Sequence, residues 1–192
     1  MAETSISETF DFKQTLVETI PHLRAFARSL THNRDLADDL VHEAVVRALS
    51  ASDHFTPGTN FRAWMFTILR NQYYNERRKW QSRAVPYDET LMKSQRQDSQ
   101  QESRLEFSDF RRAFWQLTPD QREVLMLVGA SGLSYEKAAE ICGCRVGTIK
   151  SRVSRARTDL RRILETDSVV MQRCDITAEG HWKLLEIIIE DS

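Results

Sequence analysis

Apolar residues recur every three or four positions along most of this chain, which is the spacing of amphipathic helices. Alternating apolar and polar positions, the pattern of half-buried strands, are hard to find. Only six glycines and four prolines interrupt the 192 residues, so helices can continue for many turns. The pattern predicts an all-α protein.

Three helices are expected in the first part of the chain, over about 12–30, 34–50 and 61–80. Asn33 is a suitable N-cap for the second of them, because its side chain can accept a bond from a free backbone N–H. The TPGTN sequence at 56–60 forms the loop before the third. This part of the sequence predicts a small helical bundle.

A polar stretch divides the chain. The sequence SQRQDSQQES at 94–103 has no apolar residue and cannot bury a core, so we expect a flexible linker over 82–104. Helical spacing returns after it. The sequence thus predicts two small helical domains, 12–81 and 105–165, followed by a C-terminal extension, 166–192, that combines acidic residues with an apolar end.

The second domain has the spacing of a helix-turn-helix. The TPDQ sequence at 118–121 is typical of a capping box, which begins a helix. A short helix over 134–142 then meets Gly143, and a long helix begins near Val146. Apolar residues form one stripe along that long helix, whereas the span 145–162 holds seven basic residues and one acidic residue.

The face opposite this apolar stripe suits DNA. Short polar side chains can approach base edges in the major groove, arginine can bond guanine, and cations neutralise phosphates. A solvated basic face is the alternative, but a merely soluble helix usually mixes charges to gain ion pairs four residues apart. The candidate DNA-reading residues are Thr148, Lys150, Ser151, Arg152 and Arg155.

The third helix has a second candidate surface. Its outer face mixes cations with aromatic, amide and hydroxyl groups, a composition that suits single-stranded or unstacking DNA. An ordinary amphipathic surface helix with a basic end explains this segment equally well. The residues concerned are Thr67, Arg70, Asn71, Tyr74, Arg77 and Arg78.

The second helix has an acidic face. Its inner face is expected to consist of Leu36, Leu40, Ala44 and Ala48, and its outer face of Asp35, Asp39 and Glu43, with Asp38 at the edge. Such faces are usually solvated, and an acidic first turn also favours the helix dipole. Because carboxylates repel phosphate, this face would have to bind protein if it is functional.

The sequence gives no indication of catalysis, metal binding, disulfides or a membrane span. The chain has no glycine-rich phosphate loop, nucleophile elbow or paired catalytic carboxylates, so we expect no enzyme, cofactor or small-molecule substrate. Five scattered histidines and three cysteines, Cys142, Cys144 and Cys174, make neither a metal site nor a disulfide framework. The absence of a long apolar run or an apolar N-terminus predicts no membrane span and a cytoplasmic protein.

Three segments, taken in order, resemble the core regions of extracytoplasmic-function sigma factors of the sigma-70 family. They are HLRAFARSLTHNRDLADDLVHEAVVRAL, FTPGTNFRAWMFTILRNQYYNERRK and LTPDQREVLMLVGASGLSYEKAAEICGCRVGTIKSRVSRARTDLRRIL. The resemblance covers about residues 12–165 and is greatest to the general-stress-response branch of alphaproteobacteria. It implies a subunit that directs core RNA polymerase to promoter DNA.

The resemblance gives each surface a role. The first domain would be sigma region 2, with its acidic face on the clamp helices of core polymerase. Its 52–60 loop, including Asn60, and the outer face of 61–79 would recognise and melt the −10 element. The second domain would be sigma region 4, in which 145–155 reads the −35 element. Arg145 stands where the family usually has a small residue, and it adds a candidate phosphate or base contact. An anti-sigma factor is implied as an inhibitory partner.

Two other functions compete with this interpretation. A free-standing helix-turn-helix regulator would need a sensor or dimerisation domain, and the first domain resembles neither. A protein-interaction adaptor that imitates a sigma factor would lack the basic reading helix, and that helix is present here.

Overall fold

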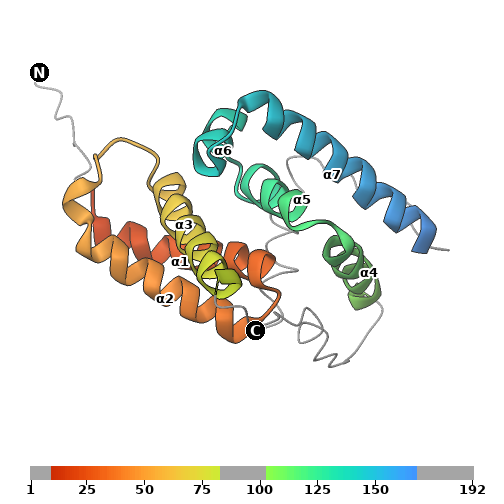
Figure 1. Ribbon diagram of the computed structural model, residues 1–192, viewed down its shortest axis with the longest axis horizontal. Helices are drawn as coiled ribbons and strands as arrows, with labels where there is room; N and C mark the ends of the chain where they lie inside the picture. The colour runs from red at the N-terminus through yellow and green to blue at the C-terminus, as the bar shows by residue number, and fades with distance from the viewer. Residues whose placement is uncertain (1–9, 83–102, 168–192) are drawn as a thin grey trace, which may run out of the picture.

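The computed structural model of the protein describes residues 10–82 and 103–167 (Figure 1). Within those two segments every regular element is a helix and no strand forms, which confirms the all-α prediction. The expected linker, 82–104, and the C-terminal extension, 166–192, lie almost entirely outside the described residues.

The first segment folds as three helices and one short turn of 3-10 helix. They are α1 (Phe12–Thr31), α2 (Arg34–Ser50), η1 (Ser52–His54) and α3 (Phe61–Ser82). Asn33 caps α2 as predicted, because its Oδ1 accepts a hydrogen bond from the Leu36 backbone N–H at 2.9 Å. His32 has a left-handed φ of 54°, which reverses the chain tightly so that α2 packs on α1.

The second segment contains the predicted helix-turn-helix. Its elements are α4 (Ser103–Gln116), α5 (Pro119–Val124), the π-helical η3 (Leu125–Ala130), α6 (Tyr135–Cys142) and α7 (Val146–Asp167). The capping box forms: the Gln121 N–H donates to Thr118 Oγ1 at 3.4 Å, and the Thr118 N–H donates to Gln121 Oε1 at 3.0 Å. Gly143 ends α6 with a φ of 63°, a conformation that glycine adopts at little cost.

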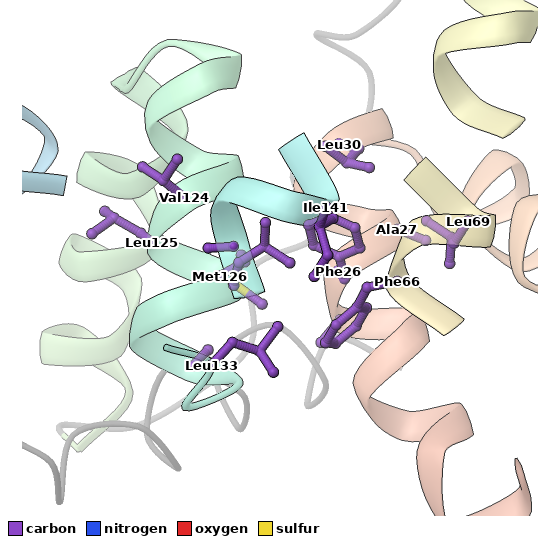
Figure 2. Close-up of a cluster of buried hydrophobic side chains, with 14 of the residues drawn as sticks. Phe26, Ala27, Leu30, Phe66, Leu69, Val124, Leu125, Met126, Leu133 and Ile141 are labelled. Atoms are coloured by element: carbon purple, nitrogen blue, oxygen red, sulfur yellow. The ribbon is translucent and has the colours of Figure 1, made fainter. Parts of the chain in front are cut away.

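One cluster of buried apolar side chains runs through both segments. Figure 2 shows Phe26 of α1 and Phe66 of α3 beside Ile141 of α6 and Met126 of η3, and none of the four is more than 3% exposed. Contacts join α1 to α5 and α3 to α6. The two domains therefore pack against each other and share a core.

The α7 helix packs by the stripe that its spacing predicted. Ile149, Val153, Ala156 and Leu160 are each at most 2% exposed, and α7 contacts α4, α5, α6 and η3. The opposite face of the helix is thereby turned to solvent.

Phe66→Ala should lower the free energy of unfolding of the full chain by about 3–5 kcal/mol, the usual cost of emptying a buried aromatic site. The Phe66 side chain is completely buried, with its ring centroid 4.9 Å from that of Phe26. Urea unfolding measures the change. Val17→Ala is the control, because Val17 is 61% exposed and should change stability by less than about 0.5 kcal/mol. Equal losses in the two variants would contradict this core.

Candidate nucleic-acid interface

The exposed face of α7 brings the predicted DNA-reading residues together. Arg145, Lys150, Ser151 and Arg155 are exposed, while Thr148 and Arg152 are half-buried. Because the apolar stripe faces α5 and α6, the exposed members of this set project from the open side of the helix-turn-helix. The result is a polar and basic surface of the kind that enters a DNA groove.

Two of these arginines also make bonds within the fold, Arg152 to another helix and Arg155 within α7. Arg152 Nη2 lies 2.8 Å from Asp120 Oδ2 in the first turn of α5. Arg155 Nε donates to the Ser151 carbonyl at 3.3 Å. A further bond between α5 and α7, from Gln121 Nε2 to Asp159 Oδ2, measures 2.6 Å. Arg152 thus orients α7, a role that its position in the sequence did not reveal.

The outer face of α3 does not stay together as predicted. Asn71 and Arg77 are exposed, and Arg78 donates to the nearby Asn75. Arg70 and Tyr74 instead turn towards the second domain. Arg70 also lies over the Tyr74 ring, with its guanidinium carbon 4.5 Å from the ring centroid. The face that the sequence predicted for DNA is therefore divided between solvent and the domain interface.

Glu123 of α5 is the partner of both turned side chains. Arg70 Nε donates to Glu123 Oε1 at 2.6 Å, and the Tyr74 hydroxyl donates to Glu123 Oε2 at 3.4 Å. The Glu123 side chain has no exposed surface, and that of Arg70 is 17% exposed. No sequence signal pointed to Glu123, because its partners lie 53 and 49 positions away.

Burial governs the ionisation of these groups. Loss of water raises the pKa of the Glu123 carboxyl above its usual value, although the Arg70 guanidinium opposes that rise. Burial, reinforced by the Glu123 charge, also raises the pKa of the Tyr74 hydroxyl, so it remains a hydrogen-bond donor. For Arg70, burial alone would lower the pKa, but the Glu123 carboxylate more than compensates and raises it.

An aromatic cluster fixes the loop before α3. Phe55 is 7% exposed and Phe61 is 5% exposed, with ring centroids 5.0 Å apart. The cluster also contains Phe10, Phe12 and Trp64. Asn60 caps α3, because its Oδ1 accepts the Ala63 N–H at 2.9 Å. The predicted −10 residue Asn60 thus has a structural role at the start of the helix.

The acidic face of α2 is exposed and partly apolar. Asp35, Asp39 and Glu43 are exposed, whereas Asp38 is half-buried and lies 3.4 Å from Arg24 Nε. The Glu43 carboxylate also accepts a bond from Gln72, which is 1% exposed. Exposed apolar side chains on the same helix are Leu36, Val46 and Leu49. A mixed acidic and apolar surface of this kind suits a protein partner.

Beside Gln72 the surface opens into a hollow of about 450 Å³. Its lining residues are Arg47, Gln72, Asn75, Glu76, Arg78 and Lys79. Burial and the neighbouring Glu43 raise the pKa of the Glu76 carboxyl. The C-terminal half of α3 therefore presents the acidic side chain of Glu76 as well as the cations that the sequence singled out.

Cys142 closes the last turn of α6. Its side chain is buried, and burial raises the pKa of the thiol to about 12. In the described part of the chain, no group of three or more His, Cys, Asp or Glu residues could hold a metal ion. Among the same residues, no helix is both long and apolar enough to cross a membrane.

Known protein families match both domains. The Sigma-70 region 2 family matches residues 16–84, and the Sigma-70 region 4 family matches residues 108–160. The chain is 50% identical over 159 residues to the ECF RNA polymerase sigma factor EcfG of Rhodopseudomonas palustris, a match that covers 83% of this chain and 88% of that protein.

Solved structures share the fold. The sigma factor RpoE of Bartonella quintana, crystallised with the anti-sigma factor NepR, is 46% identical with a TM-score of 0.68, over 82% of this chain and 99% of RpoE. CnrH, solved with the cytosolic domain of CnrY, is 29% identical with a TM-score of 0.60, over 82% of this chain and 89% of CnrH.

Two helical domains, one carrying a basic helix-turn-helix, define a DNA-binding transcription protein of the sigma-70 type. The chain belongs to the extracytoplasmic-function RNA polymerase sigma factors. As such it binds core RNA polymerase and directs it to promoter DNA. The family and the function that the sequence motifs predicted are both confirmed.

Asn60→Ala should lower the free energy of unfolding by about 1 kcal/mol, because α3 loses its N-cap acceptor. Asn60→Ser should retain most of that stability, since serine is also a good N-cap. Thermal unfolding of the two variants beside the wild type provides the comparison. Equal stability of the alanine and serine variants would show that the cap contributes nothing.

Proposed function

We propose that three surfaces of this sigma factor have separate roles. The exposed face of α7 reads the −35 element, the loop before α3 and the outer face of α3 engage the −10 element, and the acidic face of α2 binds the polymerase clamp. The observation that carries the proposal is the α7 helix. It buries the central residues of its apolar stripe, Ile149 to Leu160, against α4, α5 and α6 and leaves a basic face open.

The assignment of the −35 element rests on the shape and charge of α7. The exposed side chains at its start are short or basic, so the backbone can come close to the groove. Arg155 follows them one turn later on the same face and is exposed. Arg145, at the beginning of the helix, is exposed too and supplies a further cation for phosphate or base.

The assignment of the −10 element rests on a loop that is anchored at both ends, by Phe55 and Phe61, beside a charged helix. The aromatic cluster holds the loop against α1 and α3, so Asn60 starts α3 from a fixed position. Cations and aromatic rings on α3 then supply charge for phosphates and stacking surfaces for bases. Arg70 and Tyr74 belong to this set in sequence, although Glu123 holds both of them here.

The assignment of the polymerase surface rests on α2. Its acidic side chains cannot approach DNA without repulsion, and its exposed Val46 and Leu49 offer apolar contact area. Protein interfaces commonly combine an apolar centre with a charged rim. The α2 face carries both apolar and charged side chains.

We further infer that an anti-sigma factor controls this chain. RpoE of Bartonella quintana was solved with the anti-sigma factor NepR, and CnrH was solved with the cytosolic domain of CnrY. Control by sequestration fits a stress-response factor that acts with polymerase in the cytoplasm.

Arg155→Ala should weaken binding of the holoenzyme to −35 promoter DNA by roughly 1–3 kcal/mol, the value of a bidentate base contact. Arg155→Lys keeps the charge and should lose sequence preference more than total affinity. Gel-shift titration of holoenzyme on matched and mutated −35 sequences measures both. Arg161→Ala, an exposed arginine further along α7, should have a smaller effect. An Arg155→Ala variant that still discriminated the two sequences would contradict the assignment.

Asp39→Arg should reduce assembly with core polymerase while leaving the fold unchanged, because Asp39 is exposed and acidic. Asp39 is the better test residue than Glu43, since Glu43 also accepts a bond from buried Gln72. Glu165→Arg is the control, with the same charge change at an exposed site near the end of α7. A pull-down in which both variants assemble normally would show that the acidic face of α2 is solvated and does not bind polymerase.

A further inference from the structure

Two polar contacts join the start of α5 to one edge of α7. Arg152 Nη2 lies 2.8 Å from Asp120 Oδ2, and Gln121 Nε2 donates to Asp159 Oδ2 at 2.6 Å. The capping box holds Gln121 in turn, because its Oε1 accepts bonds from the Thr118 N–H at 3.0 Å and from the Thr118 hydroxyl at 3.1 Å. Two consecutive residues of α5 therefore bond the helix that carries the basic face.

The spacing of these contacts restrains the orientation of α7. Arg152 and Asp159 are seven residues apart, which is close to two helical turns and roughly 10 Å along the axis. They consequently lie on the same edge of the helix. A single contact would let α7 turn about it, whereas two contacts separated along the axis restrain both its rotation and its tilt. Figure 1 shows α7 running past α6, α5 and α4.

The ion pair also limits Arg152 as a reader of bases. The Arg152 side chain is only 28% exposed and its guanidinium lies against the Asp120 carboxylate, whereas Ser151 and Arg155 are both exposed. A bidentate bond to guanine needs two neighbouring N–H groups of one guanidinium, and Asp120 already occupies Nη2. Arg152 is thus directed towards α5, and its two exposed neighbours are left to face the groove.

We propose that Asp120 is a positioning residue for promoter recognition. Through Arg152 it holds α7 at the angle at which Ser151 and Arg155 meet the −35 bases, and Arg152 itself reads no base. This role rests on the proposed assignment of the −35 element to α7. It gives a part in DNA preference to a carboxylate that no DNA-binding pattern in the sequence indicated.

The negative charge of Asp120 separates positioning from direct reading. If Arg152 read a base, removing Asp120 would free its guanidinium and take away a carboxylate near the DNA, so binding would stay the same or become tighter. If Asp120 positions α7, its removal weakens sequence preference, because such sites must be held to within about 0.5 Å. An exposed ion pair contributes little to stability, so the domain remains folded in either case.

The experiment uses holoenzyme and a promoter fragment in which only the −35 bases are randomised. Bound fragments are selected and sequenced, which gives the preference at each base pair. The variants are Asp120→Ala, Arg152→Ala and the double variant, together with Asp120→Glu, which keeps the carboxylate. Glu140→Ala is the matched control, because it removes an ion pair of similar length that lies within α6, from Glu140 to Lys137 at 2.7 Å.

We expect Asp120→Ala and Arg152→Ala each to relax the preference at several base pairs. Discrimination between the best −35 sequence and a mutated one should fall roughly tenfold. The double variant should be no worse than either single variant, since both remove the same contact. Asp120→Glu and Glu140→Ala should retain the wild-type preference.

Unchanged or stronger preference in Asp120→Ala overturns the positioning role. A loss in Arg152→Ala that is confined to one base pair also overturns it, because that is the result for a direct reader. Arg155→Ala on the same library separates these outcomes from a failure of the −35 assignment, which fails only if Arg155→Ala also keeps the wild-type preference. Circular dichroism checks folding, and Asp120→Asn replaces the alanine variant under the same criteria if helix content falls.

Discussion

Burial of the apolar faces around Phe26 and Phe66 is the constraint on which the other features depend. These rings close the bundle of α1, α2 and α3, and the same cluster continues into Met126 and Ile141 of the second domain. Because the apolar side chains are buried in this core, the charged faces of α2, α3 and α7 contact solvent or the other domain. Solvent covers most of the charged faces of α2 and α7, whereas α3 packs against α6 and bonds Glu123 of α5.

Local sequence was sufficient for the helix ends and for the buried face of α7. The caps at Asn33 and Thr118 and the glycine turn at Gly143 each need only neighbouring backbone, so a few residues determine them. The α7 stripe was predictable too, because apolar residues recur there every three or four positions among charged ones. Ile149 to Leu160 supplies the contrast that fixes which side is buried.

On α2 the difference between apolar and polar positions is weaker, and the predicted inner face was partly wrong. Leu36 was expected to face inward on α2 but is 36% exposed, while Ala37 and Val41 are buried in addition to the expected Leu40 and Ala44. Alanine is small and distinguishes poorly between inside and outside, and α2 packs against both α1 and α3. The buried sector is consequently turned from the one that spacing alone indicated. The sequence could not predict the contacts between Glu123 and α3, since they join residues of separate domains that share no periodic pattern.

The position of Cys142 has a consequence for thiol chemistry. Thiolate is the reactive form of cysteine, and the burial that raises the Cys142 pKa to about 12 keeps almost every molecule in the thiol form at neutral pH. The surrounding groups that influence this thiol include Glu123 and Arg70, so its environment is that of the domain contact. Alkylation or oxidation of Cys142 therefore requires local opening that exposes the thiol, and the rate of its modification follows how often this part of the molecule opens.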